Sequence, residues 1–297
     1  MATATSGTQQ LSKGNRWGTM SGQSRLSAIL IYLALTALAL VFLFPLFYLV
    51  SRSLMSPGEI NTLPPKVLPE TPQWSNYSVA WNRAPFWRFL FNSSVIVGLQ
   101  LIGTVSSAAL CGYGFARLRF PGRNVLFILV LATLMLPSTV TLIPLYIIFA
   151  NVGWLNTFLP LTVPAFFGGG AFNIFLFRQF FMTLPVELDE AAIIDGANRW
   201  QIFTRIIMPL SVSPVVVVST LTFLAGWTDL FGPLIFLVTP EKWTLAQGLN
   251  NIFQGFYGQP QVQYVAALSL LLIIPPLALY AFVQRYLLEG IALTGVK

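Results

Sequence analysis

The chain of 297 residues contains no histidine, a single cysteine and few charged residues. Without histidine it cannot form a Ser-His-Asp triad or a histidine zinc site, and it lacks the side chain most often used in general acid–base catalysis. Cys111 alone excludes a disulfide within the chain. Charged residues make up 8% of the chain and hydrophobic residues 56%, whereas about 25% of residues are charged in a typical soluble domain. An ordinary soluble protein is therefore excluded, and a membrane protein is expected.

Uncharged stretches predict the membrane spans. They cover residues 28–50, 92–116, 124–177, 206–228 and 262–284. As one helix the third stretch would be about 80 Å long, more than twice the roughly 30 Å thickness of the hydrocarbon core. It must therefore turn back, and residues 151–156, with their Asn and Gly, are the predicted turn. The sequence predicts an all-α integral membrane protein with six transmembrane helices.

The domain boundaries and the orientation follow from the charges. Residues 1–26 are predicted to be a polar tail and residues 27–297 a single six-helix domain. Eleven of the 16 Lys and Arg residues fall in segments on the side of the N-terminus, and five fall on the other side. Because Lys and Arg accumulate in cytoplasmic segments, both termini are predicted to be cytoplasmic. The net charge of +7 is then explained by topology, and no basic face interleaved with aromatic residues indicates a nucleic-acid partner.

Two loops are long enough to have a role of their own. The outer loop, residues 51–91, contains Trp74, Trp81 and Trp87, which predicts contact with the membrane surface or with a partner. The inner loop, residues 178–211, is more informative.

The inner loop predicts two short helices, over residues 184–197 and 199–208. Pro185 lies in the first turn of the first helix, carboxylates follow it, and Gly196 supplies a left-handed stop. The second helix is predicted to end at Pro209. Between its start and its stop each helix has only about ten residues, fewer than the roughly 12 to 15 that even marginal stability in water requires, so a docking partner is expected.

Small residues in the first helix leave room for that partner to approach the backbone. These are Ala191, Ala192, Gly196 and Ala197. Glu190 offers a strong hydrogen-bond acceptor beside them. The alternative is an amphipathic helix at the lipid headgroups, but such a helix needs a large apolar face and usually a basic polar face. Asp195 and Arg199 are four residues apart and are expected to pair across the turn.

The loop carries a spacing that resembles a known signature. Glu190-Ala191-Ala192 is followed after three residues by Gly196, after nine more by Ile206, and then by Met208-Pro209. This resembles the cytoplasmic loop of bacterial ATP-binding-cassette (ABC) importer permeases, with Met208 where leucine is usual. The resemblance implies a coupling helix that sits in a cleft of an ATPase subunit. It assigns this coupling to Glu190, Ala191, Ala192, Asp195, Gly196, Ala197 and Pro209.

A wider resemblance, from about Trp74 to the C-terminus, is to the carbohydrate branch of these permeases, and there to the maltose-type second permease subunit. It rests on residues 112–123, on Leu136-Pro137 with 143–146, and on Thr244-Leu245 with Gly248-Leu249. The resemblance implies a bacterial or archaeal cytoplasmic membrane and half of a sugar pathway. It also implies four kinds of partner: a first-type permease subunit, two cytoplasmic ATPase subunits, an extracytoplasmic solute-binding protein and membrane lipid.

The expected role is not enzymatic. Nothing in the chain resembles Gly-x-x-x-x-Gly-Lys-[Ser/Thr], so no cofactor is expected on this chain, and ATP and Mg are expected on the partner ATPase subunits. Two other classes are disfavoured. An ion-coupled secondary transporter would need paired intramembrane charges and repeats, and a membrane-embedded enzyme would need a nucleophile or a carboxylate pair in the spans.

The solute pathway is the least determined part. Asp229 directly follows the uncharged stretch 206–228 and is the only acid expected in a span, if the fifth helix continues to it. Such groups usually face a wet cavity or a partner. Either it lines the path with Trp227 and Thr228, or it is an outer-end carboxylate in water or against the partner permease. The branch usually has Asn at position 228. Asn173 and Gln100 are expected to cross-link helices rather than to touch the solute, and lining of the path is the alternative. A sugar phosphate such as glycerol phosphate is the alternative cargo.

The run from Gly168 to Gly170 lies in the fourth span. It favours close helix packing over a hinge for the inward-to-outward switch.

Overall fold

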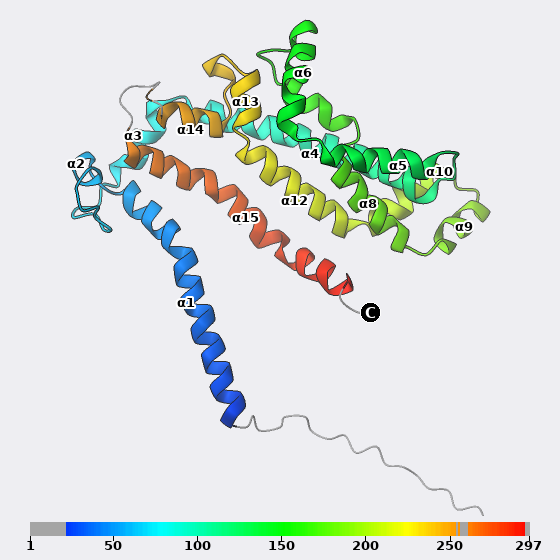
Figure 1. Cartoon of the computed structure of the whole chain (residues 1–297), viewed down its shortest axis with the longest axis horizontal. Coiled ribbons are helices and arrows are strands. Elements are labelled where there is room, and N and C mark those ends of the chain that lie inside the picture. The colour runs from blue at the N-terminus through cyan, green and yellow to red at the C-terminus, as the bar shows by residue number, and fades with distance from the viewer. Residues whose placement is uncertain (1–21, 254, 256–260, 295–297) are drawn as a thin grey trace, which may run out of the picture. The chain divides into compact units, whose positions relative to one another are not determined.

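The computed structural model describes residues 22–253, 255 and 261–294, and this part of the chain is helical nearly throughout and contains no strand (Figure 1). The chain divides into two compact units, Met1–Leu49 and Val50–Lys297. The described part of the first unit belongs to helix α1, Gly22–Ser53, which is apolar on all sides and contains Pro45. Residues 1–21 of the predicted tail lie outside the described residues, so the tail stays a prediction.

The second unit contains the remaining helices. The α-helices are α2 Pro57–Ile60, α3 Ser75–Arg83, α4 Phe86–Arg117, α5 Arg123–Ala132, α6 Ser138–Asn151, α7 Leu159–Thr162, α8 Ala171–Thr183, α9 Glu187–Ile194, α10 Arg199–Ile202, α11 Met208–Leu210, α12 Val212–Thr228, α13 Phe231–Phe236, α14 Leu245–Phe253 and α15 Val262–Thr294. Short 3-10 turns are η1 Thr133–Met135, η2 Val163–Phe166 and η4 Pro240–Lys242, and η3 Phe203–Ile207 is a π-helix.

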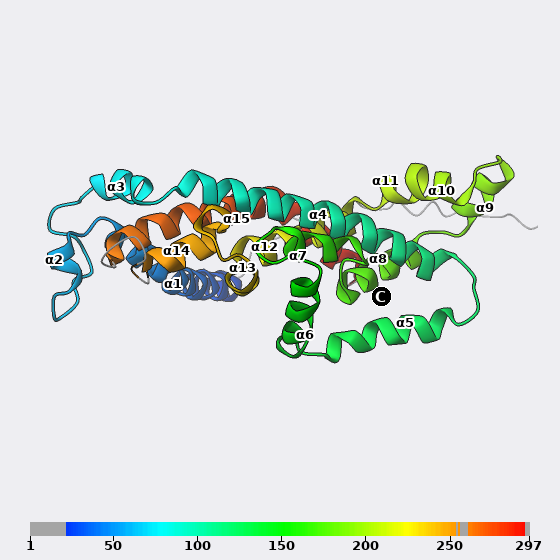
Figure 2. The same ribbon diagram turned by 90° about the horizontal axis from the view of Figure 1, so that it is seen from above.

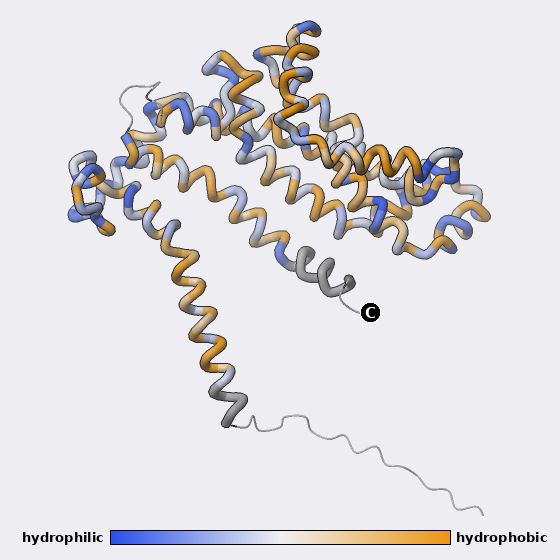
Figure 3. Tube along the Cα trace, in the orientation of Figure 1, coloured by the Kyte–Doolittle hydropathy of each residue, from blue (hydrophilic) through white to orange (hydrophobic). Residues whose placement is uncertain are grey.

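Helices α4, α8, α12 and α15 form the bundle at the centre of this unit (Figure 2). One apolar cluster surrounds Phe89 and Trp243, and a second surrounds Phe177 and Phe181. In both views α2, α3 and α14 lie at one end of the bundle, whereas α9 and α10 lie at the other. Figure 3 shows hydrophilic residues at these two ends and at the tips of α6 and α13, and largely apolar residues along the helices between them. The predicted outer and inner loops thus lie at opposite ends of the unit.

The described residues contain four helices long and apolar enough to cross a membrane. These are Ser27–Ser53, Phe86–Arg117, Leu159–Thr183 and Val262–Gln284. Two bent pairs pass the same test, Arg123–Met135 with Thr139–Asn151 at 101° and Arg199–Leu210 with Val212–Thr228 at 79°. If each pair forms one span, the total is six, the predicted number.

The turn predicted within the long apolar stretch is confirmed. Helix α6 ends at Asn151, and Gly153 and Asn156 both have a positive φ, 71° and 56°. Asn156 also accepts hydrogen bonds through its Oδ1 from the amides of Val238 and Thr239, both at 3.1 Å. The turn is therefore fixed to the segment after α13.

Two helices extend beyond the predicted stretches. Helix α4 begins at Phe86, not at Asn92, because a helix can start before its uncharged run and carry Arg88 in its first turn. The second helix of the inner loop does not end at Pro209. It continues from α10 through the π-helix to Leu210. Pro209 is tolerated there because it lies in the first turn of α11, where a backbone N–H would have no partner within the helix.

The glycine run breaks the fourth span between η2 and α8. Gly168, Gly169 and Gly170 all have positive φ, 94°, 63° and 91°. A Cβ at position 169 would lie 2.6 Å from the carbonyl oxygen of Thr104 in α4. The run therefore serves close backbone packing, as favoured from the sequence, and also turns the chain.

Candidate functional site

Helix α9 presents two different faces. Asp189 and Ala192, three residues apart, are 3% and 6% exposed and face the bundle. Glu190 and Ala191 are exposed, and the Glu190 side chain makes no ion pair or hydrogen bond among the described residues. The prediction that Ala192 leaves room for a partner was wrong, because its methyl group packs into the apolar cluster around Phe177 and Phe181.

The outer surface of this loop is apolar as well as acidic. Ile193, Ile194 and Trp200 are 44%, 85% and 61% exposed. Large apolar side chains exposed together are typical of a surface that is covered by a partner. The helix itself has only eight residues, too few to be stable alone in water.

The turn after α9 forms without an ion pair. Gly196 has a φ of 83°, as predicted for a left-handed stop, and Ala197 donates its amide to the carbonyl of Ala192 at 2.9 Å. Asn198 caps α10 through reciprocal bonds with Gln201.

The predicted pair of Asp195 and Arg199 is not formed between these two described residues. Arg199 instead accepts a hydrogen bond at its carbonyl from the Tyr113 hydroxyl, at 3.4 Å. Asp195 remains exposed at the C-terminal end of α9.

An ion pair that the sequence analysis missed holds the inner face of α9. Arg117 Nε, at the end of α4, lies 3.4 Å from Asp189 Oδ2, and both side chains are 5% exposed. Arg117 Nη2 also donates to the carbonyl of Leu184, just before α9, at 2.8 Å. One feature of the sequence could have indicated that Asp189 is buried. Asp189 and Ala192 are three residues apart and can therefore lie on the same face of a helix.

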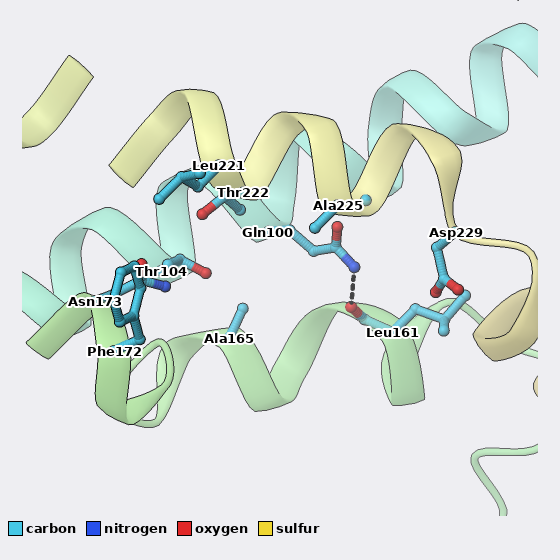
Figure 4. Close-up of a pocket in the computed structure, with 11 residues that line it drawn as sticks. Gln100, Thr104, Leu161, Ala165, Phe172, Asn173, Leu221, Thr222, Ala225 and Asp229 are labelled. Atoms are coloured by element: carbon cyan, nitrogen blue, oxygen red, sulfur yellow. Dashed lines mark hydrogen bonds between the residues drawn. The ribbon is translucent and has the colours of Figure 1, made fainter. Parts of the chain in front are cut away.

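A cavity of about 690 Å³ lies between α4, α7, η2, α8 and α12 (Figure 4). Its lining is Gln100, Thr104, Leu161, Ala165, Phe172, Asn173, Leu221, Thr222, Ala225, Gly226 and Asp229. Figure 4 places Phe172 and Asn173 at one end and Asp229 at the other. Two of the four residues predicted for the pathway, Asn173 and Asp229, therefore share one cavity.

The other two predicted pathway residues do not line this cavity. Trp227 is 4% exposed, stacks on Phe223 and donates its indole N–H to the carbonyl of Leu272 at 3.0 Å. Thr228 is exposed, and its hydroxyl donates to the carbonyl of Leu224 at 2.8 Å. The reason is geometric. Trp227 and Thr228 lie two positions and one position before Asp229, and residues at these spacings on a helix do not share a face.

Helical spacing from Asp229 identifies the residues that were missed. Thr222, Ala225 and Gly226 precede it by seven, four and three positions and share its face. Thr104 was missed as well and shares a face of α4 with Gln100, which was considered from the sequence together with Asn173.

The cavity is polar at several points but carries one charged group. Asp229 is the only charged residue in its lining, and Asp229 Oδ1 accepts a hydrogen bond from the Gly232 amide at 3.2 Å. Asn173 donates to the carbonyl of Gly169 at 2.7 Å, and Gln100 donates to the carbonyl of Leu161 at 2.8 Å. Among the residues that the structure describes, no three His, Cys, Asp or Glu side chains are close enough to hold a metal ion. The cavity therefore offers hydrogen bonds and one carboxylate.

Three comparisons relate the chain to known proteins. Residues 107–289 match the family described as binding-protein-dependent transport system inner membrane component. The sn-glycerol-3-phosphate transport system permease protein UgpE of Yersinia enterocolitica is 34% identical over 258 residues, which are 85% of this chain and 91% of that protein. UgpE of Escherichia coli O1:K1 is also 34% identical, over 257 residues covering 84% of this chain and 91% of that protein.

A solved structure shares the fold. It is a crystal structure of a bacterial ABC transporter involved in the import of the acidic polysaccharide alginate. The TM-score is 0.78 at 24% identity, and the match covers 90% of this chain and 99% of that one.

Proposed function

The chain belongs to the binding-protein-dependent transport system inner membrane components, which are permeases of ABC importers, and we propose that it forms half of the import pathway for a sugar. The described cavity between α4, α8 and α12 is the part of that pathway contributed by this chain. The proposed assembly contains a second permease subunit, two ATPase subunits that bind ATP and Mg, and an extracytoplasmic solute-binding protein. This chain has no catalytic role in it and binds no cofactor.

The proposed docking site for the ATPase is the exposed face of α9 and the turn after it. Glu190, Ala191, Asp195 and Gly196 form this face, Ile194 adds exposed apolar surface, and Ala197 and Pro209 support the turn and the link to α12. Support comes from the physical character of the segment, since a short helix with unpaired carboxylates and exposed apolar residues gains stability from a partner. ATP-driven closure of the ATPase pair would then move α9 and the helices joined to it.

The proposed topology places α9 and both termini in the cytoplasm of a bacterium or archaeon. It is supported by the excess of Lys and Arg in the inner segments and by the position of α9 at the end of the bundle opposite α2 and α3. The outer loop would then face the binding protein. Its Trp74 and Trp87 are 71% and 68% exposed.

The residues that line the cavity support the proposal that the solute is an uncharged sugar. Gln100, Asn173 and Asp229 provide donors and acceptors for hydroxyl groups, and Phe172, 48% exposed, provides an aromatic face for a sugar ring. No Lys or Arg lines this cavity. A phosphate group would meet the Asp229 carboxylate without a compensating cation.

Glycerol phosphate is the second candidate solute. It is favoured by the relatives, because the two UgpE proteins are named for its transport. The cation it requires would then have to come from the second permease subunit.

The test is uptake by the complete complex reconstituted in liposomes with its binding protein and internal ATP. We expect ATP-dependent uptake of a neutral sugar from a panel that includes glycerol phosphate. The Asp229→Asn variant keeps a hydrogen-bond acceptor for the Gly232 amide. We expect its uptake of neutral sugar to stay within about tenfold of the wild-type value, which corresponds to the loss of one interaction of about 1.4 kcal/mol. Thr228→Val is the matched control, since Thr228 lies next to Asp229 but outside the cavity.

Two results would contradict this proposal. Uptake of glycerol phosphate alone, increased by Asp229→Asn, would assign the sugar phosphate. Uptake that persists without ATP would indicate an ion-coupled transporter.

A further inference from the structure

One buried ion pair connects α9 to the C-terminal end of α4. Arg117 Nε and Asp189 Oδ2 are 3.4 Å apart, with both side chains 5% exposed. Arg117 Nη2 donates to the carbonyl of Leu184 at 2.8 Å. Arg117 therefore holds both the helix α9 and the chain segment that leads into it.

Stability alone does not explain this pair. Removing two charges from water costs several kcal/mol for each ion, and the attraction between them offsets this only with good geometry and additional hydrogen bonds. Here Arg117 Nε and Asp189 Oδ1 are buried without a hydrogen-bond partner in the described part of the chain. In some proteins a buried pair of this kind serves to fix the relative position of two elements.

Helix α4 continues from this ion pair to the cavity. It is a single helix over Phe86–Arg117, and Gln100 and Thr104 on it line the cavity. Thr104 precedes Arg117 by 13 positions, which is about 20 Å along a helix. Gly112 brings α4 against α8 so closely that a Cβ there would lie 2.7 Å from Phe177 Cβ. Movement of α9 would thus reach the cavity through a rigid, tightly packed helix.

The remaining contacts of α9 with the bundle are small. Ala192 contributes only a methyl group to the core. The Tyr113 hydroxyl bonds to the carbonyl of Arg199, after the turn, at 3.4 Å. The charged pair is therefore the main directional contact between α9 and the bundle.

We propose that Arg117 and Asp189 are positioning residues that transmit the movement of α9 to α4 and so couple ATP hydrolysis to opening of the cavity. This inference rests on the proposed function, since it requires an ATPase docked on α9. It adds a specific route, from the ATPase through Asp189 and Arg117 along α4 to Gln100 and Thr104.

The test measures solute imported per ATP hydrolysed by the reconstituted complex. We expect Asp189→Asn and Arg117→Met each to lower this ratio about fivefold or more, the lower range of an allosteric coupling, while assembled complexes keep ATPase activity. The double variant should be no worse than the more impaired single variant, because both changes break one link. Arg119→Met, an exposed arginine two positions away, is the matched control and should leave the ratio unchanged.

A merely structural role would reduce the amount of assembled complex without changing the ratio in what assembles. If the charge-removing variants do not assemble, Arg117→Lys decides, because lysine keeps the charge but lacks the planar fork that reaches both Asp189 and Leu184. A lowered ratio in that variant supports the inference, and a wild-type ratio overturns it.

Wild-type ratios in assembled single variants, or losses that multiply in the double variant, would also overturn the inference. Failure of the wild-type complex to import solute with ATP would instead contradict the proposed function.

Discussion

The side-chain amide of Gln100 occupies the space beside Gly226. A Cβ at position 226 would lie 2.2 Å from Gln100 Oε1, and Gln100 Nε2 donates to the carbonyl of Leu161 at 2.8 Å. Gly226 on α12 thereby allows a side chain of α4 to reach across to α7 along the wall of the cavity. Helices α4, α7 and α12 therefore meet at this point, through the Gln100 amide and the absence of a side chain at Gly226.

Gly226→Ala should therefore change transport more than stability. The new methyl group displaces the Gln100 amide and breaks a hydrogen bond worth about 1 kcal/mol. Replacing glycine by alanine within a helix stabilises the helix by about 0.8 to 1 kcal/mol. The two effects nearly cancel, so the midpoint of thermal unfolding should change little. Solute uptake should fall about tenfold if one contact of about 1.4 kcal/mol is lost.

The control for this prediction is Gly98→Ala on α4. A Cβ at position 98 has nothing within 4 Å. Uptake and thermal unfolding are measured for both variants in the reconstituted complex. Wild-type uptake in Gly226→Ala would show that the Gln100 amide does not shape the pathway.

Two glycines in α4 should respond to alanine in opposite directions. A Cβ at position 112 would lie 2.7 Å from Phe177 Cβ and 3.0 Å from the Arg178 amide nitrogen, whereas a Cβ at position 114 has nothing within 4 Å. Gly112→Ala should destabilise the protein by about 1 to 3 kcal/mol through overpacking. Gly114→Ala should be neutral or should stabilise it by up to about 1 kcal/mol.

Unfolding of the two variants in the same detergent tests this difference. Equal unfolding midpoints would show that α4 and α8 separate easily at Gly112.

The carboxylate of Glu59 organises the outer loop in a pH-dependent way. Hydrogen bonds from the backbone amides of Ser56 and Glu70 lower the pKa of Glu59 from 4.5 to about 2. The amide of Ser56 lies 2.7 Å from Glu59 Oε2, and that of Glu70 lies 2.6 Å from Glu59 Oε1. Because the pKa is lower in the folded loop, the carboxylate stabilises the loop fully above about pH 4.5 and loses this effect as the pH falls toward 2.

Amide hydrogen exchange at Ser56 and Glu70 measures this contribution. At each pH the wild type is compared with Glu59→Gln, so that the intrinsic pH dependence of exchange cancels. We expect greater protection in the wild type at neutral pH, and a difference that disappears between about pH 4.5 and 2. A difference that persists at pH 2 would show that the charge of Glu59 is not its cause.

Much of this architecture could be predicted from single residues and their spacing. Uncharged runs indicated the apolar segments because hydrocarbon excludes charge strongly. Gly196 predicted the stop after α9, since a positive φ of 83° costs glycine little. Residues 151–156 predicted the turn because a single helix would have been too long for the membrane.

The inner face of α9 could not be predicted in the same way. Asp189 is buried because it meets Arg117, which lies 72 positions earlier in the chain, and no local pattern records such a pairing. Trp227 was a different kind of error. Its proximity to Asp229 in sequence suggested a shared role, although helical geometry places Gly226 and not Trp227 on the face of Asp229.

A bulky side chain on the outer face of α9 should block a docking partner. Ala191 is exposed on that face, so Ala191→Trp leaves the packing of the bundle intact and costs less than about 0.7 kcal/mol in helix propensity. Its indole ring would prevent a partner from approaching the backbone. We expect insertion of this variant into the membrane to be normal. Copurification with the ATPase subunit and solute uptake should each fall about tenfold or more, because at least one contact of about 1.4 kcal/mol is lost.

This variant is a cleaner test than a bulky residue at position 196. Gly196 has a φ of 83°, so any side chain there strains the backbone by about 1 to 2 kcal/mol whether or not a partner docks. Ala191→Ser is the matched control, because serine stays small and should retain ATPase binding. Wild-type ATPase binding and uptake in Ala191→Trp would mean that no partner closely approaches this face of α9, and the proposed docking site would have to be abandoned.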